Sequence, residues 1–289
     1  MRVDNAIIMA AGTSSRFAPL SYEKHKALTI VKGEVLIERQ IKQLHAAGIS
    51  DIYIVTGYKA EQFEYLSSKY NIRLIYNPEY LSRNNNGSIW AARKILNNSY
   101  ICSADNYFSQ NPFELYVEDA YYSAVYADGF TSEWCMTEDE RGYIDAVTIG
   151  GANSWYMLGH TFWSQNFSKQ FLTILENEYD KEVTKNKLWE SIYIEHLDKL
   201  KMKMKKYDSN TIYEFDTLDE LRMFDTSYIT DTRSILLKKI AKELSVTEDK
   251  IIDISTIKSN TTEAVGFDFN CDGEHYTYFY DSEILRREE

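Results

Sequence analysis

The first hundred residues alternate short apolar runs with amphipathic stretches, and this alternation constrains the fold more than any other feature of the chain. The apolar runs have the length of buried strands, and apolar residues at helical spacing fill the intervals between them. Strands joined by helices pair in parallel through right-handed crossovers. The pattern therefore predicts an α/β fold, a Rossmann-like, mixed and mostly parallel sheet with helices on both faces. The predicted strands are Ala6–Met9, Asp51–Thr56, Arg73–Tyr76 and Tyr100–Ala104.

Caps and turns place the remaining elements. The loop Asn84–Gly87 precedes a helix for which Ser88 is the expected N-cap, and Gly150–Gly151 is expected to form a hairpin turn. Two helices are expected over Gln165–Glu178 and Lys185–Leu200. Further strands are expected at Tyr121–Ala127, around Trp134, and at Tyr143–Ile149, Tyr156–Phe162, Lys203–Tyr207 and Thr211–Phe215.

A domain boundary is expected close to residue 226, where a helix opened by Thr217 ends. It divides the chain into residues 1–226 and a small α+β appendage over residues 227–289. The appendage contains a helix at Arg233–Leu244 and a hairpin with alternating aromatic residues around the turn Asp272–Gly273.

Composition limits the partners and the compartment. Lys and Arg number 32 against 44 Asp and Glu, so the net charge is −12 and bulk binding of nucleic acid is disfavoured. Three cysteines are too few and too scattered for a disulfide framework or a zinc site. No apolar run reaches the ~18 residues of a membrane-spanning helix. We therefore expect a cytoplasmic protein with no nucleic-acid partner and no membrane span.

A loop rich in small residues follows the first predicted strand. Such residues let the backbone approach a polyphosphate, and consecutive amides there form an anion nest. Arg16 and Lys26 can add charge-assisted bonds to phosphate oxygens. The loop matches neither the Walker pattern nor the dinucleotide-binding glycine pattern. An ordinary strand-to-helix turn is the alternative. The loop residues are Ala10, Ala11, Gly12, Thr13 and Ser14.

Residues 5–31 (NAIIMAAGTSSRFAPLSYEKHKALTIV) resemble the signature of the sugar-nucleotide-type nucleotidyltransferases. Across residues 3–225 the chain is similar to the bacterial CTP:phosphocholine cytidylyltransferases. It departs from their pattern at Ser14, where the family often has Gly, and at His25, where it often has Pro. The other segments that carry the likeness are DIYIVTGYKAEQFEYL, YNPEYLSRNNNGSIWAA, SYICSADNYF, the TSEW that ends at Trp134, and NTIYEFDTLDEL.

The resemblance implies transfer of CMP from CTP to phosphocholine, which yields CDP-choline and pyrophosphate by an Mg²⁺-dependent in-line attack. It implies that Asp105 and Asp216 hold the metal, although these residue types also suit a turn and a helix cap. Glu214 is a weaker candidate ligand. Lys26, Arg16 and Asp105 are the predicted catalytic residues. The predicted nucleotide contacts come from the loop residues together with Arg16, Lys26, Asn85, Ser88 and Ala104.

Aromatic residues are unusually frequent in the middle of the chain. Quaternary ammonium groups bind to aromatic faces, and the resemblance places Trp134, Trp189 and Tyr213 at aromatic positions of the choline-binding family. Glu133 or Glu190 could add a carboxylate near the cation. Because Tyr numbers 23 and Trp 5, the alternative is that these rings belong to the core.

Two other functions stay open on the sequence alone. One is a sugar-1-phosphate nucleotidyltransferase that uses UTP or dTTP, and the other is a non-catalytic nucleotide-binding regulatory protein. The appendage weakly resembles the opening of choline-kinase-type small lobes, through the stretch ISTIKSNTTEAVGFDF, but no kinase catalytic loop follows it. We expect a structural or dimer-forming appendage, and hence a possible homodimer.

Overall fold

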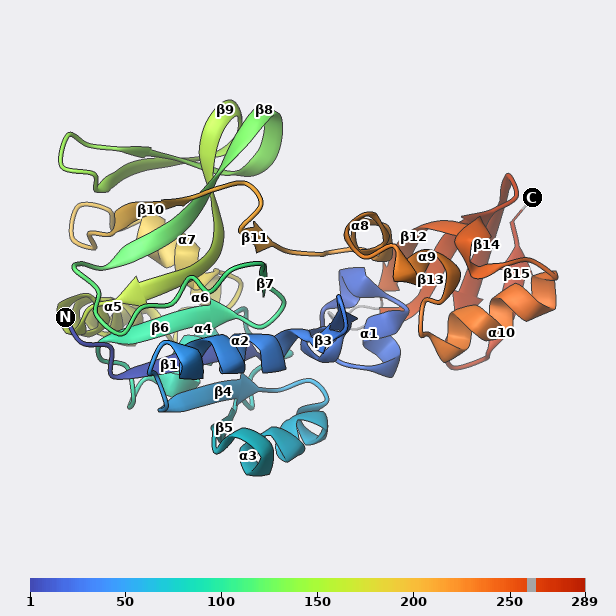
Figure 1. Cartoon of the computed structure of the whole chain (residues 1–289), viewed down its shortest axis with the longest axis horizontal. Coiled ribbons are helices and arrows are strands. Elements are labelled where there is room, and N and C mark those ends of the chain that lie inside the picture. Colours follow the sequence, from blue (N-terminus) through green and yellow to red (C-terminus); the bar gives the residue numbers. More distant parts are fainter. Residues whose placement is uncertain (259–263, 289) are drawn as a thin grey trace. The chain divides into compact units, whose positions relative to one another are not determined.

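The structure, a computed structural model, describes residues 1–258 and 264–288 (Figure 1). By compactness the chain separates into two units, each built from two segments. The first unit is Met1–Gly12 with Leu36–Glu214, and the second is Thr13–Val35 with Phe215–Glu289. The domain boundary expected at residue 226 stays a prediction.

A seven-stranded sheet forms the centre of the first unit, in the order β10-β8-β9-β6-β1-β4-β5. β1 pairs in parallel with both β4 and β6, whereas β9 runs antiparallel between β6 and β8. The sheet is therefore mixed and mostly parallel, and the predicted α/β fold is confirmed. Its strands are β1 (Asn5–Ala10), β4 (Ile52–Thr56), β5 (Arg73–Tyr76), β6 (Ser99–Ser103), β8 (Tyr121–Glu138), β9 (Ile144–Trp163) and β10 (Lys203–Tyr207).

Short helices and turns connect these strands. Helix α2 (Leu36–Ala46) buries one apolar face, and the chain turns away just after it at Gly48, whose φ is +83°. Helix α5 (Gln165–Glu178) begins where the Ser164 hydroxyl accepts a bond from the Phe167 amide. The other elements of this unit are η3 (Ala60–Phe63), α3 (Glu64–Tyr70), α4 (Asn86–Ala92), β7 (Tyr107–Phe108), α6 (Glu182–Lys185), α7 (Trp189–Ile194) and β11 (Ile212–Tyr213).

Helix α4 starts earlier than the sequence pattern indicates. Asn85, not Ser88, is the residue that precedes the helix, so the predicted serine cap is wrong. Ser88 lies inside the first turn, where its hydroxyl accepts a bond from the Asn77 amide at 3.4 Å. The expected helix Lys185–Leu200 is also too long, because the chain forms only the short α6 and α7 in this region.

The predicted hairpin at Gly150–Gly151 is also wrong. Both glycines lie within β9, where Gly151 opposes Thr131 and Gly150 has a φ of +75°. Glycine inside a strand marks an irregularity of the ladder rather than its end. A Cβ atom on Gly151 would lie 2.9 Å from the Cys135 sulfur, so a larger residue there would require the Cys135 side chain to move. The hairpin turn lies instead at residues 139–143, and the four expected strands are two long ones.

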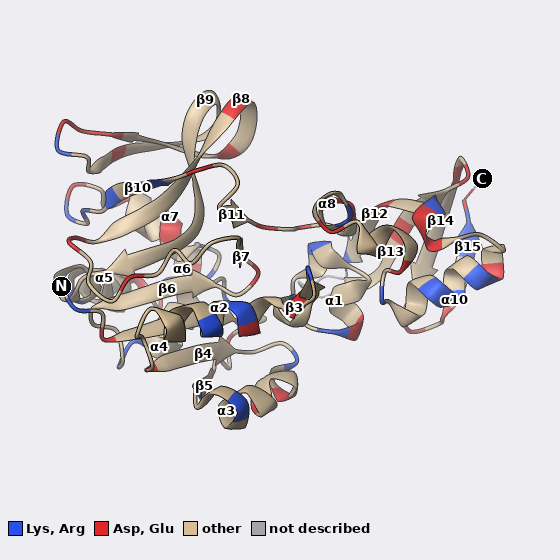
Figure 2. Cartoon of the chain, in the orientation of Figure 1, with Lys and Arg blue, Asp and Glu red and all other residues tan. Residues whose placement is uncertain are grey.

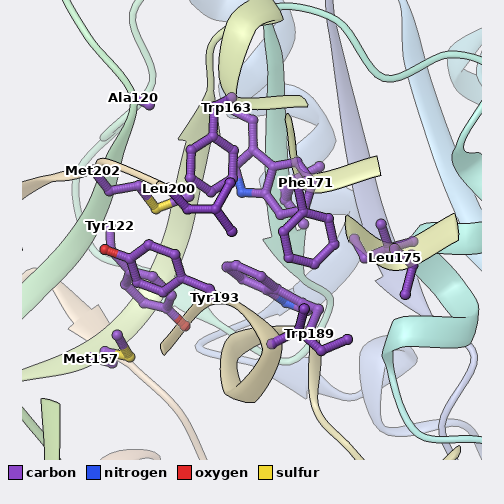
Figure 3. Close-up of a cluster of buried hydrophobic side chains, with 14 of the residues drawn as sticks. Ala120, Tyr122, Met157, Trp163, Phe171, Leu175, Trp189, Tyr193, Leu200 and Met202 are labelled. Atoms are coloured by element: carbon purple, nitrogen blue, oxygen red, sulfur yellow. The ribbon is translucent and has the colours of Figure 1, made fainter. Parts of the chain in front are cut away.

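The core of the first unit is strongly aromatic. Trp163 and Phe171 are fully buried with ring centroids 4.6 Å apart, and Trp189 meets Trp163 edge-on at 5.1 Å. Figure 3 shows these rings together, with Tyr122 and Tyr193 on the other side of Trp189. Strands β1, β4 and β6 carry no charged residue (Figure 2), as expected for strands covered on both faces.

The second unit joins an N-terminal segment to the C-terminal part of the chain. Its four-stranded antiparallel sheet has the order β12-β13-β14-β15, and the predicted hairpin at Asp272–Gly273 joins β13 to β14. Helix α8 (Leu218–Phe224) starts with the predicted cap, a reciprocal pair between Thr217 and Glu220. Residues 259–263 of the stretch that resembles a kinase lobe lie outside the described residues. The other elements are η1 (Ser15–Phe17), α1 (Leu20–Glu23), η2 (Lys26–Leu28), β2 (Ile30–Val31), β3 (Glu34–Val35), α9 (Ser227–Thr230), α10 (Ile235–Leu244), η4 (Glu248–Lys250), β12 (Ile251–Lys258), β13 (Ala264–Cys271), β14 (Glu274–Phe279) and β15 (Ile284–Arg287).

Two phenylalanines allow a matched test of this core. Phe171 is fully buried, and Phe130 on β8 is 84% exposed. We expect Phe171→Ala to lower the free energy of unfolding by about 3–5 kcal/mol, because it removes a ring and leaves a cavity. Phe130→Ala should change it by less than ~0.5 kcal/mol. Urea unfolding followed by circular dichroism measures both values. Equal losses for the two variants would contradict this assignment of the core.

Candidate active site

The strand ends of the first unit bring the small-residue loop and the Asp105 loop to one edge of the sheet. Met9 of β1 pairs with Ser103 of β6, and the Ala104 amide donates to the Met9 carbonyl at 3.2 Å. Ala10, Ala11 and Gly12 continue from this point, and the Ala11 carbonyl accepts a bond from the Tyr58 amide at 3.0 Å. In open α/β sheets ligands bind beyond this carboxyl edge.

Gly57 lets the turn that carries Tyr58 lie close to the Ala11 carbonyl. A Cβ atom at Gly57 would lie 2.8 Å from the Ala11 carbonyl oxygen and 2.6 Å from Tyr80. The contacting atoms are the Ala11 backbone oxygen and the Tyr80 Cβ atom, which do not move when a side chain rotates. A larger residue at position 57 would therefore push this turn away from the loop.

The Asp105 loop is held from α2. The Gln40 side-chain amide donates to the carbonyls of Ser103 and Asn106, at 2.9 and 2.8 Å, and so brackets Asp105 on both sides. The Ser103 hydroxyl donates to the Asp105 carboxylate at 2.7 Å. The Asn106 amide donates to Glu214 at 3.3 Å, which connects this loop to the end of β11. Asp105 is partly exposed and therefore accessible to a ligand.

In the second unit, three of the predicted site residues form one ionic cluster. Asp216 accepts Arg16 at 2.8 Å and Lys26 at 3.3 Å. The Lys26 side chain is 4% exposed, and a buried ammonium requires an anionic partner. The His25 ring accepts the Ala27 amide at 3.1 Å and fixes the turn that carries Lys26. From the sequence we predicted that Arg16 and Lys26 bind phosphate and that Asp216 binds a metal. That these residues pair with one another was not predicted.

One departure from the family pattern, Ser14, lies at a position with an unusual backbone conformation. Its φ is +50°, in the left-handed region, where a residue with a Cβ atom is strained and glycine is not. Thr13 and Ser14 lead from Gly12 into η1, which carries Arg16. The usual glycine of the family at this position therefore has a conformational reason, and this chain keeps the conformation without it.

Asn85 connects the predicted base-binding loop to α7. Its side-chain amide donates to Glu190 at 2.9 Å, and its side-chain oxygen accepts the Trp189 amide at 2.7 Å. These two bonds tie the Asn85 side chain to the first turn of α7. The roles of Asn85 and Ser88 in nucleotide binding stay predictions.

The three aromatic residues predicted for the acceptor occupy different environments. Trp189 is 1% exposed and its ring stacks on Tyr122 at 5.8 Å, so it belongs to the core. Trp134 is partly buried against the same cluster. Tyr213 lies edge-on to Tyr107 at 6.4 Å, on the short pair of strands β11 and β7. Contact of each with substrate stays a prediction.

Carboxylates converge on tyrosines that the sequence analysis missed. Burial raises the pKa of Tyr122 well above its usual value, and the charges of Glu190 and Glu214 add to this increase. The pKa of Tyr156 is raised by burial and by Glu133 and Glu214. No local signal singles out Tyr122, because the first five residues of β8 are all buried and the strand does not alternate there.

Glu190 lies in the same region and is strongly desolvated. Some of the residue's surface is still exposed, but protein atoms surround the carboxyl group and raise its pKa to about 7, despite the hydrogen bonds from Asn85 and Tyr122. A carboxylate held among aromatic rings at such a pKa is poised to ionise when a cation arrives.

Asp105 lies in the first unit and Asp216 in the second, and each carboxylate offers the hard oxygen ligands that Mg²⁺ prefers. Their binding of a metal stays a prediction. Within residues 1–258 and 264–288 no group of three or more His, Cys, Asp or Glu is placed to hold a metal. Over the same residues, none of the helices is both long and apolar enough to cross a membrane.

Known proteins resemble this chain over most of its length. Residues 6–112 match the family of MobA-like NTP transferase domains. A choline-phosphate cytidylyltransferase of Haemophilus influenzae is 36% identical over 219 residues, which are 75% of this chain and 94% of that protein. A 2-aminoethylphosphonate cytidylyltransferase of Lancefieldella rimae is 33% identical over 234 residues, 80% of this chain and 95% of that protein.

A solved structure agrees over a similar extent. The CTP:phosphocholine cytidylyltransferase of Streptococcus pneumoniae is 31% identical, with a TM-score of 0.75 over 78% of this chain and 99% of its own. Together with the fold, these matches define the chain as a nucleotidyltransferase enzyme. It belongs to the family of the choline-phosphate cytidylyltransferases.

The raised pKa of Glu190 leads to a pH-dependent stability. Between its ordinary pKa and about 7 the folded protein holds a proton on Glu190 that the unfolded chain has released. The contribution of this group to stability therefore falls as the pH rises through that range. We expect Glu190→Gln, which does not titrate, to gain stability relative to the unsubstituted protein from pH 5 to pH 8 in urea unfolding.

The control for this experiment is Glu176→Gln, which replaces an exposed glutamate on α5. Its stability difference from the unsubstituted protein is measured at the same pH values and gives the reference for an exposed glutamate. A constant difference for Glu190→Gln would show that its carboxyl group is not desolvated.

Proposed function

We propose that this enzyme transfers CMP from CTP to phosphocholine and releases pyrophosphate. The observation that carries the proposal is the 36% identity to the Haemophilus choline-phosphate cytidylyltransferase, over 94% of that relative. The pairing of aromatic rings with carboxylates in the first unit supports it, because a quaternary ammonium is bound by rings and balanced by an anion.

The chain's own groups act by positioning and by charge. A phosphocholine oxygen attacks the α-phosphate in line, and no covalent enzyme intermediate is needed because the nucleophile is already anionic. Arg16 and Lys26 bind phosphate oxygens, which replace or share their contacts with Asp216. The loop Ala10–Ser14 offers backbone amides to the triphosphate. These fixed charges stabilise the negative charge that shifts toward the departing pyrophosphate.

Asp105 and Asp216 are the proposed ligands of Mg²⁺. When bound, the metal supplies positive charge to the triphosphate and to the leaving pyrophosphate. Gln40 and Ser103 orient Asp105, and the two cations orient Asp216. Each carboxylate is thus held in place by groups of its own unit before any ligand arrives.

The acceptor site is proposed around Trp134, Tyr213 and Glu190. The Trp134 and Tyr213 rings would face the cation, and Trp189 would support the site from the core through its stack on Tyr122. Binding of a cation would favour the ionised form of Glu190. The relative that uses 2-aminoethylphosphonate acts on a molecule that also combines a cationic nitrogen with a phosphorus anion, so it is the nearest competing acceptor.

A cytoplasmic location is part of this proposal, and a homodimer stays a prediction. Sugar-1-phosphates are disfavoured as acceptors, because they need polar hydrogen-bonding groups rather than rings. A regulatory protein without catalysis is disfavoured because Lys26, Asp105 and Asp216 are all present.

An initial-rate assay of pyrophosphate release tests the reaction. We expect the highest kcat/KM with CTP and phosphocholine, lower values with 2-aminoethylphosphonate, and none with glucose-1-phosphate and UTP or dTTP. Asp105→Asn should lower kcat by about 10²–10³, because it removes one key electrostatic group. Faster turnover of glucose-1-phosphate, or CTP binding by calorimetry without turnover in the presence of Mg²⁺, would overturn the proposal.

Two tryptophans of the β8–β9 pair test the acceptor site. We expect Trp134→Leu to raise KM for phosphocholine roughly thirtyfold, since a desolvated cation–π contact contributes ~2 kcal/mol. KM for CTP should not change. Trp155→Leu is the matched control, because the Trp155 ring already contacts Tyr126 and Lys206. The same increase in both variants would remove the assignment of Trp134.

A further inference from the structure

The segment that carries Arg16 and Lys26 is built into the same compact unit as the C-terminal part of the chain. We propose that α10 and the sheet β12–β15 with the adjoining Tyr280, named here the clamp, hold residues 13–35 in the conformation that binds the nucleotide. Tyr280 and Thr256 are then positioning residues for CTP. The proposal rests on the nucleotide role of Arg16 and Lys26.

Glu23 forms the first attachment between the segment and the clamp. Its carboxylate accepts the Ser234 hydroxyl at 2.5 Å and the amides of Ile235 and Leu236 at 2.9 and 3.0 Å. These amides open α10, so the segment supplies an anion to the positive end of that helix. Because Glu23 lies between Arg16 and Lys26 in the chain, this contact fixes the turn that joins the two cations.

A ring stack and a side-chain bond form the second attachment. Tyr22 and Tyr280 stack with centroids 3.7 Å apart and planes 7° from parallel. The Thr256 hydroxyl of β12 donates to the Ser15 carbonyl at 2.5 Å. Ser15 follows the strained Ser14 and precedes Arg16, so this bond acts on the loop at the point where its backbone is least relaxed.

The helices before the clamp hold the far end of the segment. The Ile30 carbonyl accepts both the Tyr228 hydroxyl at 2.7 Å and Arg233 at 2.8 Å. The Lys32 amide donates to Asp225 at 2.7 Å. Arg222 of α8 then binds the carbonyls of Glu248 and Ile251 at 2.8 and 2.7 Å, which ties the helix after Asp216 to the start of β12. The segment is thus fixed at both ends and in the middle by residues more than 180 positions away.

This arrangement differs from a passive appendage. Besides the side-chain contacts of Tyr22 and Glu23, Thr256 and Tyr228 bond to backbone carbonyls of the segment. Backbone contacts set the path of the loop itself. The backbone amides and the two cations of this loop must match the spacing of the phosphates, so a small shift of the path weakens nucleotide binding.

The test uses the full chain and substitutes the clamp side only. We expect Tyr280→Ala to raise KM for CTP about tenfold, since misplaced binding groups lose affinity steeply with distance. KM for phosphocholine should stay unchanged, and amide hydrogen exchange should become faster in residues 13–24 of the ligand-free protein. Tyr280→Phe keeps the ring and should keep both properties. Thr256→Val should also raise KM for CTP, and amide hydrogen exchange in residues 13–24 should again become faster.

Tyr276→Ala is the matched control, since the Tyr276 ring stacks on Phe269 of the same sheet. It should leave KM for CTP and exchange in residues 13–24 unchanged. If Tyr280→Ala does not fold, Thr256→Val decides alone. Unchanged exchange and unchanged KM for CTP in the folded variants would overturn the clamp. Hydrogen exchange needs no substrate, so it tests the clamp even if the unsubstituted enzyme fails to use phosphocholine.

Discussion

The burial of Lys26 is the constraint on which the second unit depends. An ammonium group with a side chain only 4% exposed cannot remain charged without an anion, and Asp216, 190 residues further along the chain, provides it. This pair joins the N-terminal segment to the C-terminal part of the chain, together with the contacts of Glu23, Tyr22 and Ile30. It accounts for the discontinuous composition of the unit, which no contiguous domain boundary would predict. Arg16 on the same carboxylate extends the pair into a cluster of two cations and one anion.

The first unit depends on a different constraint, the parallel pairing of β1 with β6. That pairing aligns Met9 with Ser103, so the two loops that follow leave the sheet side by side. Gln40 then brackets Asp105 from α2, which makes the direction of the carboxylate a property of the sheet and helix rather than of the loop alone. A loop that would otherwise be free to move is therefore fixed by two elements that pack through their apolar faces.

Local signals in the sequence predicted much of the fold. The bounds of β5 and α5 match those predicted, and α8 begins after the predicted Thr217 cap; a serine or threonine caps each of these two helices. The sequence pattern predicted four shorter strands in place of the long β8 and β9. Glycine has the same local signature in a turn and in a strand irregularity. For the site, the sequence indicated which residues take part but not how they pair. Nothing local indicated that Arg16 and Lys26 share Asp216, or that Glu190 acts on Tyr122, because both depend on contacts between distant segments.

The electrostatics of the two units give one argument for the clamp. A chain of net charge −12 must bind a highly anionic nucleotide and an acceptor that also carries a phosphate. At physiological ionic strength charges more than ~8 Å away are largely screened, so the surrounding acidic surface contributes little repulsion and the nearest groups decide the binding energy. Affinity then depends on how accurately Arg16, Lys26 and the loop amides are placed. A short loop with a strained residue cannot supply that accuracy by itself. Contacts from Thr256, Tyr228 and Tyr280 to the same segment are the kind of support that can.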